Sequence, residues 1–151
     1  MSLVDRFIAW ALAKERHPIP IVTHDTGMLL LHRYQPFWPD EFRSRGGDVF
    51  CRPPWWRPFN ILLHHWQAGH REAMHDHPRW SITICLKGRL LEHTPWESRV
   101  LTPGAIVFRS RKAIHAFELL PGCGETWTLF IVGRRNHRQN GYVVKPFGGK
   151  P

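Results

Sequence analysis

Short apolar runs alternating with polar residues recur along the second half of the chain, from residue 59 onward. Alternation with a period of two is typical of strands that bury one face. Turn-forming residues separate these runs, among them Gly88 and the Pro103-Gly104 pair. A series of short strands with regular turns predicts an all-β sandwich or barrel. The expected strands are 60–66, 72–77, 81–87, 89–93, 97–101, 105–109, 113–120 and 126–132.

The first 58 residues follow a different pattern. Apolar residues at helical spacing predict a short amphipathic helix over 3–16, which Pro18 and Pro20 end. Prolines punctuate the stretch 17–58, in which 28–34 is the one strand we predict and 46–48 a turn. We therefore expect one structural domain: an N-terminal helix with an irregular, edge-strand extension (1–58), a core barrel (59–133) and a loose tail (134–151).

Two histidines, His75 and His77, stand one residue apart ahead of an apolar run, and a third, His115, follows behind another strand-like run. Residues i and i+2 of a strand point to the same face, so the first two can bind one ion together. Three imidazoles leave coordination positions open, as a reactive metal requires. The pattern predicts a three-histidine site for one divalent transition metal, with Fe(II), Ni, Zn and Mn equally compatible. The alternative is a polar strand with chance alternation.

The same stretch resembles the first motif of the cupin superfamily, which runs Gly, five residues, His-x-His, three or four residues, Glu, six residues, Gly. Gly69, His75, His77 and Gly88 stand at the matching positions. Ser81 stands where most cupins have a metal-binding Glu, which favours three histidine ligands without a carboxylate at that position. The resemblance implies a double-stranded β-helix, or jelly-roll barrel, preceded here by the short helix.

The second cupin motif is matched more loosely, by the Pro103-Gly104 turn and His115, and the Pro-x-Gly that normally precedes the histidine is missing. The likeness covers about residues 59–133. It is distant to cysteine dioxygenase-type cupins, because 128–132 lacks their Ser-His-Tyr triad. Small bacterial and phage cupins of unassigned activity are more similar, through a His-Asp-His-Pro-Trp type run and the 125–130 run Glu-Thr-Trp-Thr-Leu-Phe.

Five side chains are candidates for binding a substrate beside the ion, and no catalytic residue is assigned. Strand alternation places Ser81 and Thr83 on the side of the histidine ligands, unless a bulge at Pro78 exchanges the faces. One of the neighbours His64 and His65 can enter the barrel, and His65 is taken as the candidate. The remaining candidates are Arg79 and Arg57.

Both arginines also have simpler explanations. Arg79, two residues past His77, is placed to meet an anion at the ion, but it can equally extend from the rim into solvent. Arg57 lies in a segment rich in Trp and Pro, where it could meet a carboxylate or phosphate. An extended segment packed over a sheet edge explains that composition more simply.

The net charge of +9, from 21 Lys and Arg against 12 Asp and Glu, favours anionic partners. Basic clusters at 109–112 and 134–138, with eight Trp, are features that nucleic-acid binding would use. We expect a small anionic ligand instead, because the basic residues are spread and no nucleic-acid motif is present. Three widely spaced Cys predict reduced thiols rather than a disulfide framework.

No apolar run has the length of a membrane span, and Asp5 and Arg6 interrupt any signal-peptide pattern, so we expect a cytoplasmic protein without a membrane partner. Cupins commonly dimerise through their sheets, and the resemblance therefore implies a homodimer. Two functions remain open. One is a mononuclear metal cupin acting on a small anionic molecule, with Fe-dependent, dioxygenase-like chemistry if the ion is Fe(II). The other is a non-catalytic binding module whose metal is structural or absent.

Overall fold

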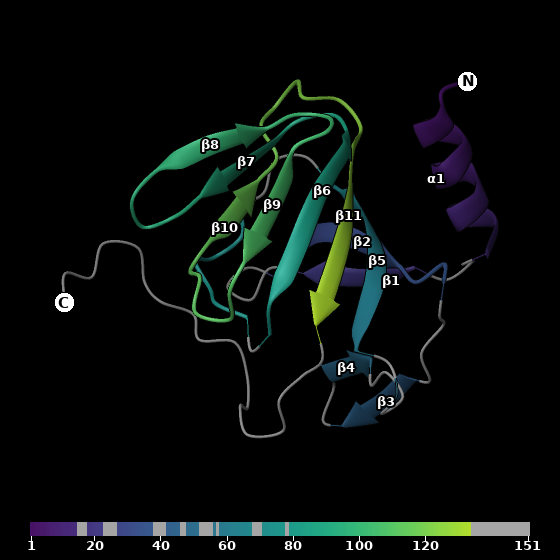
Figure 1. The fold of residues 1–151 in the computed structure, drawn as a ribbon, viewed down its shortest axis with the longest axis horizontal. Coiled ribbons are helices and arrows are strands. Elements are labelled where there is room, and N and C mark those ends of the chain that lie inside the picture. The colour runs from purple at the N-terminus through teal and green to yellow at the C-terminus, as the bar shows by residue number, and fades with distance from the viewer. Residues whose placement is uncertain are drawn as a thin grey trace.

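Two antiparallel sheets pack against each other around the core in the computed structural model (Figure 1). The structure describes residues 1–14, 18–22, 27–37, 42–45, 48–51, 56, 58–67, 71–77 and 79–133, with the backbone alone for 42–45 and 48–51. Strands of the larger sheet follow the order β1-β2-β5-β11-β6-β9, and those of the smaller sheet the order β10-β7-β8. A separate pair, β3 and β4, forms a two-stranded sheet. The elements are α1 (Leu3–Lys14), β1 (Ile19–Val22), β2 (Leu29–Tyr34), β3 (Phe42–Arg45), β4 (Asp48–Cys51), β5 (Phe59–Trp66), β6 (Ser81–Lys87), β7 (Leu90–His93), β8 (Ser98–Leu101), β9 (Ile106–Arg109), β10 (Ala116–Glu118) and β11 (Thr126–Gly133).

Alternation along the central strands builds the interior. On β6 the side chains of Ser81, Thr83 and Cys85 are buried, while those between them are half-buried on the outer face. Ser81, Thr83 and Cys85 therefore form a small inner side of this strand, and Ile82, Ile84 and Leu86 form its apolar outer side. Core residues from both sheets, such as Trp66 of β5 and Phe117 of β10, pack together in a T-shaped pair with ring centroids 5.2 Å apart.

The all-β prediction with one N-terminal helix is confirmed, and most strands lie within two residues of their expected bounds. The predicted strand over 72–77 is wrong. That segment makes only two isolated bridges, Arg71 with Glu118 and His75 with His115. The bridged residues are four apart in one segment and three apart in the other, so an extra residue interrupts the ladder as a bulge does. The strand predicted over 113–120 is correspondingly shortened to β10.

The helix begins with a reciprocal cap. Ser2 Oγ accepts a hydrogen bond from the Asp5 backbone N–H, and Asp5 Oδ2 accepts from the Ser2 backbone N–H, both at 3.1 Å. Ile8 and Ala11 are buried against Tyr34, Leu63 and Trp127, which the sheet presents on its outer face. In Figure 1 the helix accordingly lies outside the barrel. It covers the sheet and leaves the interior to the site.

Three strands in the first 58 residues were not predicted: β1, β3 and β4. The sequence did not predict β1 because this strand contains Pro20, yet β1 pairs with β2. An edge strand tolerates proline because one row of its N–H groups faces away from the sheet. Of the turn predicted at 46–48, residues 46 and 47 lie outside the described residues, and residue 48 is the first residue of β4. Gly69, Pro78 and the predicted tail, 134–151, also lie outside the described residues.

Gly88 joins β6 to β7 with a φ of 76°. A Cβ atom on this residue would lie 2.1 Å from Oγ1 of Thr126 and 2.6 Å from the carbonyl oxygen of Glu125. Positive φ and a close backbone approach are the two conditions that require glycine. The last glycine of the sequence motif therefore has a structural role, holding the start of β7 against β11. Among the described residues, no helix has the length and apolar character needed to cross a membrane.

Candidate metal centre

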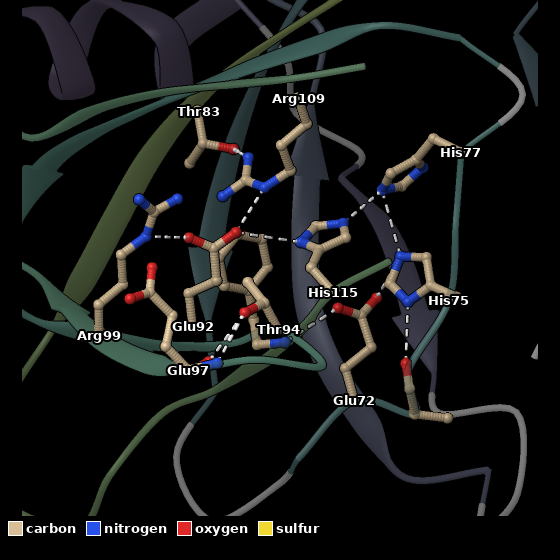
Figure 2. Close-up of polar contacts among 12 residues, drawn as sticks. Glu72, His75, His77, Thr83, Glu92, Thr94, Glu97, Arg99, Arg109 and His115 are labelled. Atoms are coloured by element: carbon tan, nitrogen blue, oxygen red, sulfur yellow. Dashed lines mark hydrogen bonds and ion pairs between the residues drawn. The ribbon is translucent and has the colours of Figure 1, made fainter. Parts of the chain in front are cut away.

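Three imidazoles converge on one point inside the barrel. His75 and His115 are buried and His77 is half-buried, and their ligand nitrogens all lie within 4.8 Å of one another. His77 Nε2 is 3.2 Å from His75 Nε2 and 2.9 Å from His115 Nε2. Figure 2 shows the three rings pointing toward one another. The bridge between His75 and His115, made by hydrogen bonds of 2.9 Å in both directions, brings the two distant parts of the chain together.

The hydrogen bonds around these rings leave lone pairs facing the centre. His75 Nδ1 is 2.9 Å from the carbonyl oxygen of Ala73, which can only accept, so the proton lies on Nδ1 and Nε2 carries the lone pair that would bind an ion. His115 Nδ1 faces the carboxylate of Glu92, which favours the same tautomer. His77 Nε2 can donate to only one of its two neighbours. A cation would satisfy these converging lone pairs, and the donor set fits a divalent transition metal.

Burial keeps two of these histidines neutral. It lowers the pKa of His77 well below 6.5, with the nearby histidines acting in the same direction. Burial also lowers the pKa of His115, to about 4, although the Glu92 carboxylate opposes the shift. Neutral imidazole is the form that binds a metal, so the site is prepared for ligation at neutral pH.

An ionic network of the buried Glu92 and Arg109 with the exposed Arg99 lies beside His115 (Figure 2). Glu92 accepts from Arg109 Nε at 2.5 Å and from Arg99 Nε at 2.8 Å, and its Oε1 is 3.6 Å from His115 Nδ1. That last distance is long for a hydrogen bond, so we describe it as an electrostatic contact. Burial alone would raise the pKa of Glu92, but its contacts with His115, Arg109 and Arg99 outweigh this and lower it to about 2. Arg109 Nη1 donates in turn to Thr83 Oγ1 at 2.7 Å, which fixes its orientation.

A cavity adjoins the histidines. It offers about 40 Å³ to the centre of a water molecule, opens partly to solvent, and lies between the larger sheet and β10. Glu72 is the one carboxylate among its described lining residues, and Oε1 of this residue lies 3.5 Å from His75 Nε2. Burial raises the pKa of Glu72. The rest of the lining consists of Ile21, Leu31, Arg33, His64, Trp66, His77, Thr83, His115, Phe117, Thr128 and Phe130.

The predicted substrate-binding residues do not lie together in the structure. Thr83 lines the cavity, while Ser81 is fully buried on the same side of β6 and is not among the lining residues described. Arg79 Nη1 donates to the carbonyl oxygen of Gly133 at 3.4 Å, at the end of β11. Arg57 lies outside the described residues.

His65 lies on the outer face of β5, where it stacks on Trp127 with ring centroids 4.2 Å apart. Its neighbour His64 lines the cavity instead, since adjacent strand residues face opposite sides. Of the two neighbours that sequence alone could not separate, His64 is therefore the one that enters the barrel.

Three residues of the site were missed in the sequence: Glu72, Glu92 and Arg33. Glu72 lies three residues before His75, close enough to have been weighed as a ligand. Glu92 lies on β7, two residues after the start of an apolar run, where a buried carboxylate signals a partner. Arg33 lies two residues after the apolar run Leu29–Leu31 of β2. In the last two cases the signal was a charged residue within a strand that begins with apolar residues.

Comparison with known proteins places the fold. No model of a known protein family matches the sequence, and a search of curated proteins finds no match. Solved structures do match. DMSP lyase DddQ from Ruegeria pomeroyi DSS-3 aligns with a TM-score of 0.60 and 20% identity over 97% of this chain and 68% of that chain. Rru_A2000 from Rhodospirillum rubrum, a cupin-2 domain, aligns with a TM-score of 0.58 and 12% identity over 86% and 75%.

A third structure, of the DMSP lyases RdDddP and RnDddQII, matches with a TM-score of 0.48 and 21% identity over 58% of this chain. The match spans less than half of that chain, 44%. The first two alignments share the all-β architecture described above. The chain therefore has the cupin fold, with a cluster of three histidines in its barrel.

Proposed function

We propose that this protein is a mononuclear metal cupin in which His75, His77 and His115 hold one divalent transition metal. The observation that carries the proposal is the convergence of three Nε2 atoms, two of whose rings have their Nδ1 atoms turned to an oxygen partner. Carboxylate or carbonyl partners of this kind orient histidine ligands in metal sites. The structural likeness to cupins supports the same conclusion at the level of the fold.

We further propose that the site acts on a small anionic molecule. Three neutral imidazoles leave the charge of a divalent ion uncompensated, and Glu72 is the one carboxylate in the described lining of the adjoining cavity. A bound ion would supply Lewis acidity or, if it is Fe(II), reactivity toward O2. The chain itself contributes apolar walls that limit water, such as Phe117 and Phe130, and Glu72 as an acid-base group beside His75.

The test is metal content by elemental analysis of tag-free protein, compared with a His75→Ala and His77→Ala double variant. One equivalent of metal in the wild type and its loss in the double variant are expected. A His65→Ala variant is the matched control, because this histidine lies on the opposite face and should leave metal content unchanged.

Reconstitution under anaerobic conditions with Fe(II), Ni, Zn and Mn then compares the ions. O2 uptake by the Fe(II) form would favour the dioxygenase-like reaction. A metal that stays bound without exchange, in a protein that shows no O2 uptake or other turnover, would favour the non-catalytic binding module. Failure of all four ions to bind would contradict the metal proposal itself.

A further inference from the structure

A second polar pair lines the same cavity as His77 and His115. Arg33 of β2 and His64 of β5 are directly opposite in the antiparallel ladder, and both line the cavity. Arg33 Nε donates to His64 Nε2 at 3.2 Å. The imidazole is buried and accepts on Nε2, so it is neutral with its proton on Nδ1. His64 thus fixes the guanidinium without neutralising its charge.

Arg33 differs in this respect from the other cationic side chain of the interior. Arg109 Nε donates to the carboxylate of Glu92 and Nη1 to the hydroxyl of Thr83, so an ion pair compensates its charge although Nη2 is buried without a hydrogen-bond partner among the described residues. Within the part of the chain that the structure describes, no Asp or Glu comes close enough to Arg33 to form an ion pair, although the charge of Arg33 acts on Glu72 across the cavity and opposes the rise of its pKa. Because Nε is used by His64, the two terminal nitrogens remain as a planar pair of donors. A half-buried guanidinium with this end unoccupied is suited to a bidentate anion.

The pair is close to the proposed metal. The Phe130 ring lies 5.1 Å from the ring of His64 and 5.8 Å from the ring of His77, measured between centroids. The two imidazoles therefore flank the same phenyl ring. Arg33 and His77 also line the same cavity, and the charge of Arg33 contributes to the lowered pKa of His77, so a small molecule at the ion would lie within the electrostatic range of Arg33. Between them the walls are largely apolar, with Leu31, Trp66 and Phe117 among the lining residues.

We propose that Arg33 is the specificity-determining residue of the site and binds the carboxylate of a small substrate whose other end lies at the metal. This inference rests on the proposed function, because it assigns one end of the molecule to the ion. A carboxylate fits better than a phosphate. It needs two coplanar donors, which the free end of one guanidinium supplies, whereas phosphate presents more oxygens and a larger charge than a single arginine satisfies. The hydroxyl of Thr128, which also lines the cavity, already accepts from Trp66 Nε1 at 3.0 Å.

The experiment titrates propionate, and separately inorganic phosphate, into the Zn(II)-loaded and the metal-free protein. Saturation-transfer NMR on propionate gives the affinity. The side-chain Nε–H signal of Arg33, identified by its absence in Arg33→Gln, reports the place of binding. Metal content is measured on every sample. Arg89→Gln is the matched control, since Arg89 is an exposed arginine at the start of β7. Arg33→Lys keeps the charge, removes the planar donor pair, and serves as a second variant if the glutamine variant does not fold.

We expect saturable propionate binding that shifts the Arg33 signal, falls about tenfold or more in Arg33→Gln, falls less in Arg33→Lys and is unchanged in Arg89→Gln. Arg33→Gln should keep its metal. Equal propionate affinity in wild type and Arg33→Gln, no saturable binding to the wild type, or tighter binding of phosphate through Arg33 would each overturn the carboxylate assignment. If the wild type holds no metal, the proposed function fails, while Arg33-dependent propionate binding by the metal-free protein would still support the carboxylate subsite.

Discussion

Replacing Glu92 by glutamine tests the support of the metal centre. The substitution keeps the shape of the side chain and removes its charge. Glu92 and Arg109 are both almost fully buried, so the variant leaves a guanidinium in the interior without its anionic partner. Breaking a buried pair on one side commonly costs about 3 to 5 kcal/mol. The fall of the Glu92 pKa from 4.5 to about 2 corresponds independently to roughly 3 kcal/mol.

The assay is urea unfolding of the metal-free protein at pH 7. We expect Glu92→Gln to lose about 3 kcal/mol at an unchanged slope. Glu118→Gln is the control, because Glu118 pairs with His93 at 2.8 Å near the surface, and such pairs contribute about 1 kcal/mol or less.

The pH dependence adds a second readout. The folded-state pKa of Glu92 is depressed, so its contribution is fully present above pH 4.5 and is lost as the pH falls toward 2. The variant should lack this part of the acid destabilisation. Because Glu92 also faces His115 Nδ1, competition with a chelator should show metal affinity weakened by about 10- to 100-fold. A loss of stability below about 1 kcal/mol together with wild-type metal affinity would refute the role given to this carboxylate.

Four further substitutions, one of them a control, test other parts of the argument. Gly88→Ala should destabilise the protein by at least about 2 kcal/mol in thermal unfolding, because its Cβ would collide with Thr126. Gly104→Ala, at a similar φ but with open space around it, should cost about 1 kcal/mol, and equal losses would contradict the collision argument. Burial holds the pKa of His64 in the folded protein well below its value in the unfolded chain, so the wild type should lose stability as the pH falls below 6.5. In His64→Gln this loss should be smaller. The same dependence of unfolding free energy on pH in both proteins would contradict the argument. Glu72→Gln should weaken metal binding about tenfold in the chelator competition, and wild-type affinity would remove this carboxylate from the ion's surroundings.

Sequence predicted most of the barrel because its strands alternate cleanly. β6 has one face on the core, and its burial alternates with a period of two that can be read directly from the sequence. The edge strand β1 was missed because pairing with β2 determines it, and its own residues, including Pro20, argue against a strand. The local pattern of apolar and polar residues predicts which side chains are buried, but it says much less about which strands pair.

The site divides in the same way. His75, His77 and His115 were found from their spacing, and the structure brings them together. Arg33 and Glu92 were not found, because each becomes part of the site only through strands that are distant in sequence. Arg33 meets His64 across β2 and β5, and Glu92 meets Arg109 from another sheet. The spacing of residues along the chain does not predict contacts between side chains on strands that are distant in sequence.

The extra residue between the two isolated bridges sets how the chain tolerates changes in length. Arg71 and His75 are four residues apart, whereas their bridge partners, Glu118 and His115, are only three residues apart. Deleting Ala73 would allow a continuous ladder, and strand pairing would gain hydrogen bonds. It would also remove the carbonyl that holds His75 Nδ1 and reverse the faces of part of the segment. Insertions and deletions here should therefore abolish metal binding while leaving the barrel folded, whereas the turn around Trp96, fully exposed between β7 and β8, should accept them.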